Sequence, residues 1–182
     1  MNDQAGRIRW ENIKDPHVYG FFFAGVILNA IEASLNKERR SFQDIDEIQI
    51  MGKKYDRELG FASYETIWIP TSLSAALSEE CLYRGVVQSE LEEIIGKKKG
   101  LMISSLLFGI AHISNPFEPK YWAYGLLTSL CGFYLGKLYQ ESDYQLEKPI
   151  AAHFWFNMAA GTPLFLLDPV NNPLGLKVTF YF

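Results

Sequence analysis

Charged residues in this chain are confined to a few segments, and the long stretches between them carry almost none. The charges gather in residues 1–14, 37–65 and 90–99. A helix on the surface of a soluble protein shows charge on nearly every turn, whereas a helix that crosses a bilayer excludes it from about 20 consecutive residues. The segregation therefore favours a membrane protein, although a hydrophobic content of 48% would also suit a soluble one.

The uncharged stretches predict an all-α, multi-pass membrane helix bundle of about four to five helices. The expected helices are residues 18–35, 64–95, 100–113, 121–139 and 149–167. The first is short for a span, because crossing the hydrocarbon needs at least about 17 residues. Gly96 is placed to end the second. Lipid cannot solvate the polar groups that these helices carry, so we expect them to meet in a buried, water-accessible cavity.

The 182 residues are predicted to form a single membrane domain in the cell membrane. Its motif-bearing core spans about residues 64–167. Residues 1–17 are expected to be a polar lead-in, 36–63 a polar connection with a short helix or strand near 45–51, and 168–182 a C-terminal tail. The first residues are polar over a long stretch, so we do not expect them to be a cleavable signal peptide.

The net charge argues against nucleic-acid binding, and the two cysteines show no metal or disulfide motif. The net charge is -4 and there is no basic, aromatic stripe, so the chain is not expected to bind nucleic acid. Cys81 and Cys131 lie in apolar helical patterns, without a CxxC motif. We interpret them as small buried hydrophobic residues.

Two adjacent acids interrupt the second predicted helix, in the stretch SEECLYR. Glu80 and Arg84 are four residues apart, so they share a helix face and can form an ion pair. Glu79 is turned by about 100° from Glu80 and can point elsewhere. A charge in hydrocarbon costs at least about 2.5 kcal/mol, which calls for a partner or a function. The alternative is a surface salt bridge worth less than about 1 kcal/mol, with Glu79 solvated.

Two further polar patterns, FGIAH and HFWFN, follow in uncharged helices. Phe108 and His112 are four residues apart, as are His153 and Asn157. Taken singly, each pattern fits a structural role, such as a hydrogen bond between helices. The chain has three histidines, however, and only His17 lies outside these patterns. Their joint occurrence after the paired acids favours a functional site.

The order of EECLYR, FGIAH and HFWFN resembles the signatures EExxxR, FxxxH and HxxxN of the CPBP family, the CAAX-protease and bacteriocin-processing group also called Abi. The resemblance covers roughly residues 73–161 and includes flanking sequence such as LSEECLYRGVVQSEL. It implies a glutamate-type intramembrane peptidase without cofactor or metal. Its expected partners are the lipid bilayer and a peptide or protein substrate, and the residues do not select prenylated substrates over bacteriocin-like or leader peptides.

The resemblance implies four catalytic residues, Glu79, His112, His153 and Asn157, and three supporting residues, Glu80, Arg84 and Phe108. Glu79 would be the base that deprotonates a water molecule, which His112 helps to hold. His153 and Asn157 would form the oxyanion site. The sequence itself leaves open whether Glu79 or Glu80 is the base.

Two other interpretations use the same residues. A carboxylate of this pair with His112 and His153 would make an open zinc site, since two histidines and one carboxylate form a known catalytic set, although the chain has no HExxH motif. Alternatively, the chain is a non-catalytic membrane immunity or scaffold protein whose polar groups join helices. The second interpretation does not require both His153 and Asn157 at their positions.

Overall fold

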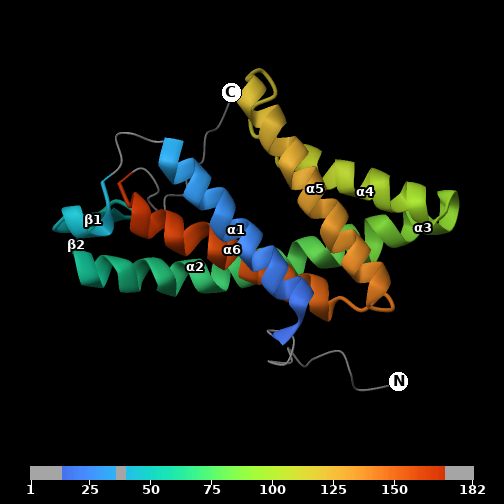
Figure 1. Cartoon of the computed structure of the whole chain (residues 1–182), viewed down its shortest axis with the longest axis horizontal. Helices are drawn as coiled ribbons and strands as arrows, with labels where there is room; N and C mark the ends of the chain where they lie inside the picture. The colour runs from blue at the N-terminus through green and yellow to red at the C-terminus, as the bar shows by residue number, and fades with distance from the viewer. Residues whose placement is uncertain (1–13, 36–39, 171–182) are drawn as a thin grey trace. The chain divides into compact units, whose positions relative to one another are not determined.

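Helix is the dominant structure of the chain, as the apolar segments predict (Figure 1). The computed structural model describes residues 14–35 and 40–170. Its α-helices are α1 (Pro16–Leu35), α2 (Arg57–Glu80), α3 (Ser89–Ile95), α4 (Lys97–Ala111), α5 (Pro119–Glu141) and α6 (Glu147–Leu167). A π-helical segment, Cys81–Gln88, joins α2 to α3 in one continuous rod. With that rod counted once, the described residues contain five helical rods, and the mainly helical prediction is confirmed.

All the predicted helices begin earlier than the sequence pattern indicates, and the difference is largest for α2 and α4. α2 starts at Arg57, because the carboxylate of Asp56 accepts a 2.9 Å hydrogen bond from the backbone N–H of Leu59 and caps the first turn. α4 starts at Lys97, so the lysines that were expected to separate two helices form a first turn instead. Gly96 allows this change of direction, since its φ of 86° is a backbone conformation that favours glycine.

The predicted polar connection contains a β-hairpin. β1 (Glu47–Ile50) pairs antiparallel with β2 (Lys53–Asp56), and the turn residues Met51 and Gly52 have φ angles of 48° and 80°. The segment looks polar in the sequence because its apolar residues alternate with polar or charged ones, and this alternation is typical of a strand with one buried face. The short element expected near residues 45–51 is therefore the first strand of a hairpin.

The chain divides into two compact units, and α1, α2 and α6 each contribute to both. One unit comprises the residues up to 19 together with 75–153, and the other comprises 20–74 together with the residues from 154 onward. In the second unit, Ile48 and Ile50 of the hairpin share a buried core with Tyr64 and Phe165. α6 also lies beside α1 there, where the rings of Phe21 and Phe156 stack at 4.5 Å.

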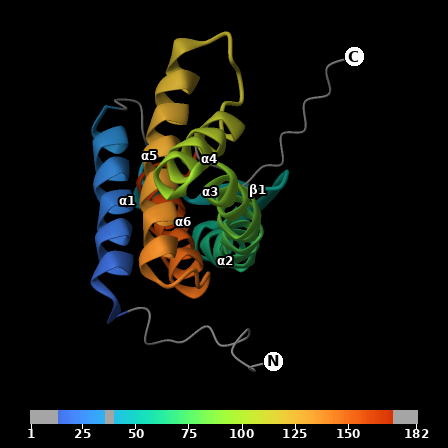
Figure 2. The same cartoon turned by 90° about the vertical axis from the view of Figure 1, so that its right-hand side faces the viewer.

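In the first unit, α4 and α5 pack so closely that their backbones nearly touch (Figure 2). Gly109 of α4 faces Gly125 and Ser129 of α5, and a Cβ atom on Gly109 would overlap the Ser129 hydroxyl and the Gly125 carbonyl oxygen. Ser129 itself donates a 2.8 Å hydrogen bond to that carbonyl. Small residues at the contact therefore set the distance between the two helices.

Replacing Gly109 by alanine is expected to destabilise the protein by about 1–3 kcal/mol, because the added methyl group forces α4 away from α5. Gly20 is a matched control, since it is also helical and a Cβ atom there meets nothing within 4 Å. Gly20→Ala should be stabilising by roughly 0.5–1 kcal/mol from helix propensity alone. Melting temperatures of both variants in detergent test this, and equal values would contradict the close packing.

Among the described helices, α6 is long and apolar enough to cross a membrane, and 28% of its most apolar window is buried. A shorter apolar stretch covers Pro16–Leu28 of α1. The remaining described helices do not meet the same criterion of length and composition. One helix thus supports a membrane location, and a multi-pass arrangement stays a prediction.

Candidate active site

Glu80 and Arg84 form a fully buried ion pair, with exposed side-chain fractions of 0% and 2%. Arg84 Nη1 donates to Glu80 Oε1 at 3.0 Å, and Nη2 donates to the backbone carbonyl of Gly132 in α5 at 2.9 Å. The guanidinium carbon lies 4.5 Å from the ring centroid of Phe108, within cation–π range. The surface salt bridge considered from the sequence is therefore wrong, because every partner of this arginine is inside the fold.

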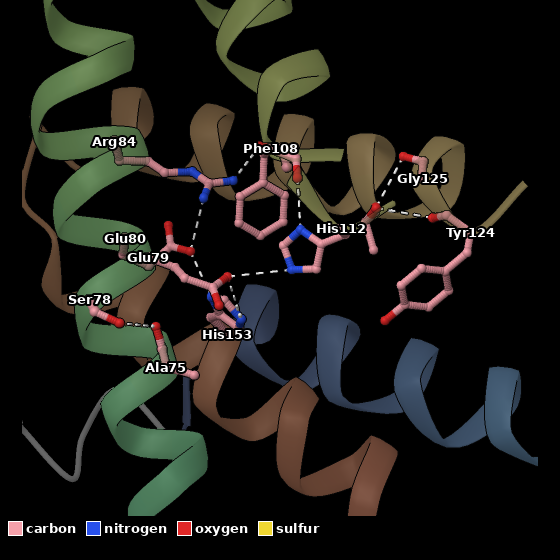
Figure 3. Close-up of polar contacts among 12 residues, drawn as sticks. Ala75, Ser78, Glu79, Glu80, Arg84, Phe108, His112, Tyr124, Gly125 and His153 are labelled. Atoms are coloured by element: carbon pink, nitrogen blue, oxygen red, sulfur yellow. Dashed lines mark hydrogen bonds and ion pairs between the residues drawn. The ribbon is translucent and has the colours of Figure 1, made fainter. Parts of the chain in front are cut away.

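His153 of α6 is oriented by the same carboxylate (Figure 3). Its Nδ1 lies 2.7 Å from Glu80 Oε1, and its side chain is buried. That oxygen already accepts from the Arg84 guanidinium, and a carboxylate beside a cation acts as an acceptor. Nδ1 of His153 is therefore the donor, which leaves Nε2 as the nitrogen directed into the site.

His112 directly follows the last residue of α4 and is held by that helix. Its Nδ1 lies 2.7 Å from the backbone carbonyl of Phe108, one turn earlier, and a carbonyl can only accept. Nδ1 therefore carries the proton, and Nε2 faces away from the helix end. Phe108 thus contributes its carbonyl to His112 and its ring to the arginine (Figure 3).

The free nitrogens of both histidines converge on Glu79. Glu79 Oε2 lies 3.6 Å from His112 Nε2 and 3.9 Å from His153 Nε2. This oxygen is shielded and has no hydrogen-bond partner among the described residues, although 30% of the side chain is exposed. The two acids consequently differ. Glu80 is buried and accepts hydrogen bonds from the Arg84 guanidinium and the His153 imidazole, whereas Glu79 faces two imidazoles and is partly exposed.

The structure thus places six of the seven sequence-predicted residues in one cluster: Glu79, Glu80, Arg84, Phe108, His112 and His153. Asn157 follows His153 by one turn of α6, in the part of the helix that belongs to the other unit, and its role stays a prediction. Within residues 14–35 and 40–170, no group of three or more His, Cys, Asp or Glu residues is arranged to hold a metal ion.

Sequence reasoning missed one member of the site, the carbonyl oxygen of Gly132. A backbone acceptor leaves no side-chain signature, so the motifs do not reveal it. The available signal was the small-residue spacing CGFYLG, in which Gly132 and Gly136 are four residues apart and permit close approach of a second helix.

Comparison with known proteins agrees with the motif pattern. A profile of Rce1-like type II CAAX prenyl endopeptidases matches residues 62–159, more than half of the 182 residues. The chain belongs to this family. It is the CPBP, or Abi, family whose signatures the sequence carries, so the predicted resemblance is confirmed. No curated protein and no solved structure matches the chain.

Family membership makes the chain a CAAX-type protease or a related membrane protein. An Rce1-like protease acts on a peptide or protein substrate, and the family is membrane-embedded. The matched region contains all six clustered residues, from Glu79 to His153. The site and the family thus coincide in the same part of the chain.

Proposed function

We propose that the chain is an intramembrane endopeptidase that hydrolyses a peptide bond of a membrane-presented peptide or protein, with Glu79 as the base. The observation that carries this proposal is the convergence of two oriented imidazole nitrogens on one carboxylate oxygen, at 3.6 and 3.9 Å. Hydrolysis without a covalent intermediate needs a base for water and donors for the developing oxyanion; Glu79 can be the base, and His153 can be a donor when its ring is protonated.

In the proposed reaction, Glu79 takes one proton from a water molecule that His112 Nε2 helps to hold. The water oxygen forms a bond to the carbonyl carbon of the scissile peptide, and the carbonyl oxygen becomes an oxyanion. When the intermediate collapses, the carbon–nitrogen bond breaks and Glu79 returns its proton to the leaving amine. The base is thereby regenerated without any change in oxidation state.

His153 and Asn157 are proposed to stabilise the oxyanion. His153 donates its Nδ1 hydrogen to Glu80, so it can donate from Nε2 only as an imidazolium. The Glu80 carboxylate, held by Arg84, compensates that positive charge in a buried setting. Glu80 and Arg84 therefore support the chemistry by orienting and charge-balancing His153 rather than by touching water.

Exposure favours Glu79 over Glu80 as the base. A water-activating carboxylate must be reachable by water and free to accept a proton. Glu80 is fully buried with one oxygen already engaged by Arg84 and His153, whereas Glu79 is 30% exposed and its inward oxygen faces the two Nε2 atoms. This contrast is the basis for assigning different duties to two adjacent acids.

The side chains around the cluster suit a membrane setting. Large apolar residues on α4 and α5 are half or more exposed, including Leu106, Ile110, Leu126 and Leu130. Exposed apolar side chains, where they gather in number, mark a contact with lipid or protein. A multi-pass arrangement would bury these residues in hydrocarbon, and the cluster would then receive its substrate at the bilayer.

A cleavage assay tests the proposal. The protein, purified in detergent, is incubated with a farnesylated CAAX peptide, the same peptide without its lipid, and a leader peptide, and the products are identified by mass spectrometry. Cleavage of one substrate that is lost in His112→Ala and His153→Ala supports the assignment. Unchanged cleavage in both variants refutes the assignment of the site. If no substrate is cleaved and an immunity phenotype of the protein in cells survives both substitutions, the non-catalytic immunity protein is indicated instead.

Chelation separates this mechanism from the zinc alternative. Because the proposed steps use only side chains of the protein, kcat should change by less than twofold after dialysis against EDTA or 1,10-phenanthroline. Readdition of Zn²⁺ should likewise leave the rate unchanged. Loss of cleavage on chelation, with recovery on Zn²⁺, would instead assign Glu79, His112 and His153 as metal ligands.

A further inference from the structure

A second buried polar group lies about one turn beyond Arg84 on the same rod. Gln88 has an exposed fraction of 0%, and its side-chain nitrogen donates to the backbone carbonyl of Gly136 at 3.0 Å and to Glu92 Oε1 at 2.7 Å. Glu92, which is also buried, accepts a further 2.7 Å hydrogen bond from the Gln140 side chain. None of these residues belongs to the family signatures.

These contacts continue the pattern set by Arg84 and form a ladder with a constant step. Arg84 bonds Gly132, Gln88 bonds Gly136, and Glu92 bonds Gln140, and each pair is 48 residues apart in the chain. The three contacts therefore follow one another in the same direction along the rod and along α5. We refer to these three pairs as the ladder.

The π-helical segment keeps the ladder residues on one face of the rod. Every fourth residue on an α-helix advances by about 40° around the axis, so a row of them drifts off the contact. A π-helix takes more residues per turn, and its four-residue steps fall short of a full turn instead. Because residues 81–88 are π-helical between two α-helical parts, the opposite drifts offset each other from Glu80 to Glu92.

Tyr144 anchors the far end of the ladder at a conformational cost. Its hydroxyl donates to Glu92 Oε2 at 2.9 Å, while its backbone has a φ of 60°, which is unfavourable for any residue with a Cβ atom. Glycine would relieve that strain. The ring is also covered by Lys97, whose ammonium lies 5.2 Å from its centroid. A tyrosine at this strained position indicates that the contacts of its side chain with Glu92 and Lys97 outweigh the backbone strain.

Gln88 likewise makes specific hydrogen bonds at a position where an apolar side chain would be more stable. Its Oε1 is buried without a hydrogen-bond partner among the described residues, and a Cβ atom on Gly136 would lie only 2.5 Å from it. A buried unpaired carbonyl oxygen is destabilising, and an apolar residue of similar volume would avoid it. What the amide adds is its pair of donated hydrogen bonds, to α5 and to Glu92.

We propose that Gln88, Glu92 and Tyr144 are positioning residues: they lock α5 in register with the rod, so that the Gly132 carbonyl holds Arg84, and Arg84 in turn aims Glu80 at His153. None of the three touches the reacting atoms. The inference rests on the proposed function for its kinetic consequence, while its structural consequence, the orientation of His153, stands independently of any activity.

The test compares Tyr144→Phe and Glu92→Gln with Glu93→Gln, an exposed neighbouring acid that lies outside the ladder. If the ladder positions Arg84 and through it His153, the first two variants lower kcat by about 10- to 100-fold and leave KM within about twofold, because small displacements of catalytic groups strongly reduce the rate. Tyr144→Gly should lose kcat equally, although it relieves backbone strain.

The second readout is the imidazole of His153. The chain has three histidines, so protein labelled with ¹⁵N-histidine in detergent gives a spectrum that single substitutions can assign. The His153 Nδ1 signal should move in Tyr144→Phe and Glu92→Gln and stay unchanged in Glu93→Gln. A folded Tyr144→Phe or Glu92→Gln variant with a wild-type His153 signal overturns the proposal, whatever happens to kcat. If no substrate is cleaved, the proposed function fails, and these spectra still decide the ladder.

Discussion

Glu79→Gln is expected to lower kcat by about 10²- to 10⁴-fold, the usual contribution of a general base, without a large change in melting temperature. The substitution keeps the shape of the side chain and removes only its ability to take a proton. Glu79 Oε2 accepts no hydrogen bond from the described residues and the side chain is partly exposed, so the fold does not depend on its charge. The readout is cleavage rate together with thermal unfolding in the same detergent.

Two comparisons make this result specific. Glu90→Gln removes an exposed carboxylate on the same rod and should leave both cleavage and melting unchanged. Glu80→Gln should lower the melting temperature as well as the rate, because it removes the negative charge that pairs with Arg84 and leaves only a weaker, neutral acceptor for Arg84 and His153. If Glu79→Gln retains activity and Glu80→Gln alone abolishes the chemistry at wild-type stability, the two acids have exchanged roles.

Arg84→Met is expected to destabilise the protein by about 3–5 kcal/mol, the cost of leaving one member of a buried ion pair without its partner. The change strands the Glu80 carboxylate in the interior, leaves the Gly132 carbonyl without its donor, and removes the cation from the face of Phe108. The free energy of unfolding, from denaturant or thermal titration in detergent, measures the effect. Lys98→Met, at an exposed position, should change it by less than about 0.5 kcal/mol.

The double variant with Glu80→Leu and Arg84→Met separates stability from chemistry. Replacing both members of a buried pair by apolar residues is often close to neutral, so most of the lost stability should return. Cleavage should stay low, since Nδ1 of His153 has lost its acceptor. A double variant that is stable and fully active would show that this pair supports the fold only, and an Arg84→Met protein of wild-type stability would contradict its buried position.

The helices and the candidate site residues could be predicted from the sequence because both depend on local patterns. Uncharged runs marked α1, α4, α5 and α6 to within a few residues. Their ends were less certain, since the Asp56 cap and the Gly96 turn act through single residues. The hairpin between α1 and α2 was obscured because half of its side chains are polar, although Ile48 and Ile50 carry the buried face.

The distribution of duties within the site was not accessible in the same way. Adjacent acids such as Glu79 and Glu80 have the same chemistry, and only the surroundings decide which is enclosed by Arg84 and which faces the histidines. The orientation of each imidazole likewise depends on what its Nδ1 meets, a carbonyl for His112 and a carboxylate for His153.

What the sequence by itself determined is the family, the mainly helical fold and a short set of candidate residues, because motif spacing and hydrophobic runs are properties of nearby positions. Only the tertiary structure decided that the Glu80–Arg84 pair is buried, that Glu79 faces two Nε2 atoms, and that the Gly132 carbonyl completes the arginine site. Each of these depends on contacts between residues from about 30 to more than 70 positions apart, which packing alone brings together.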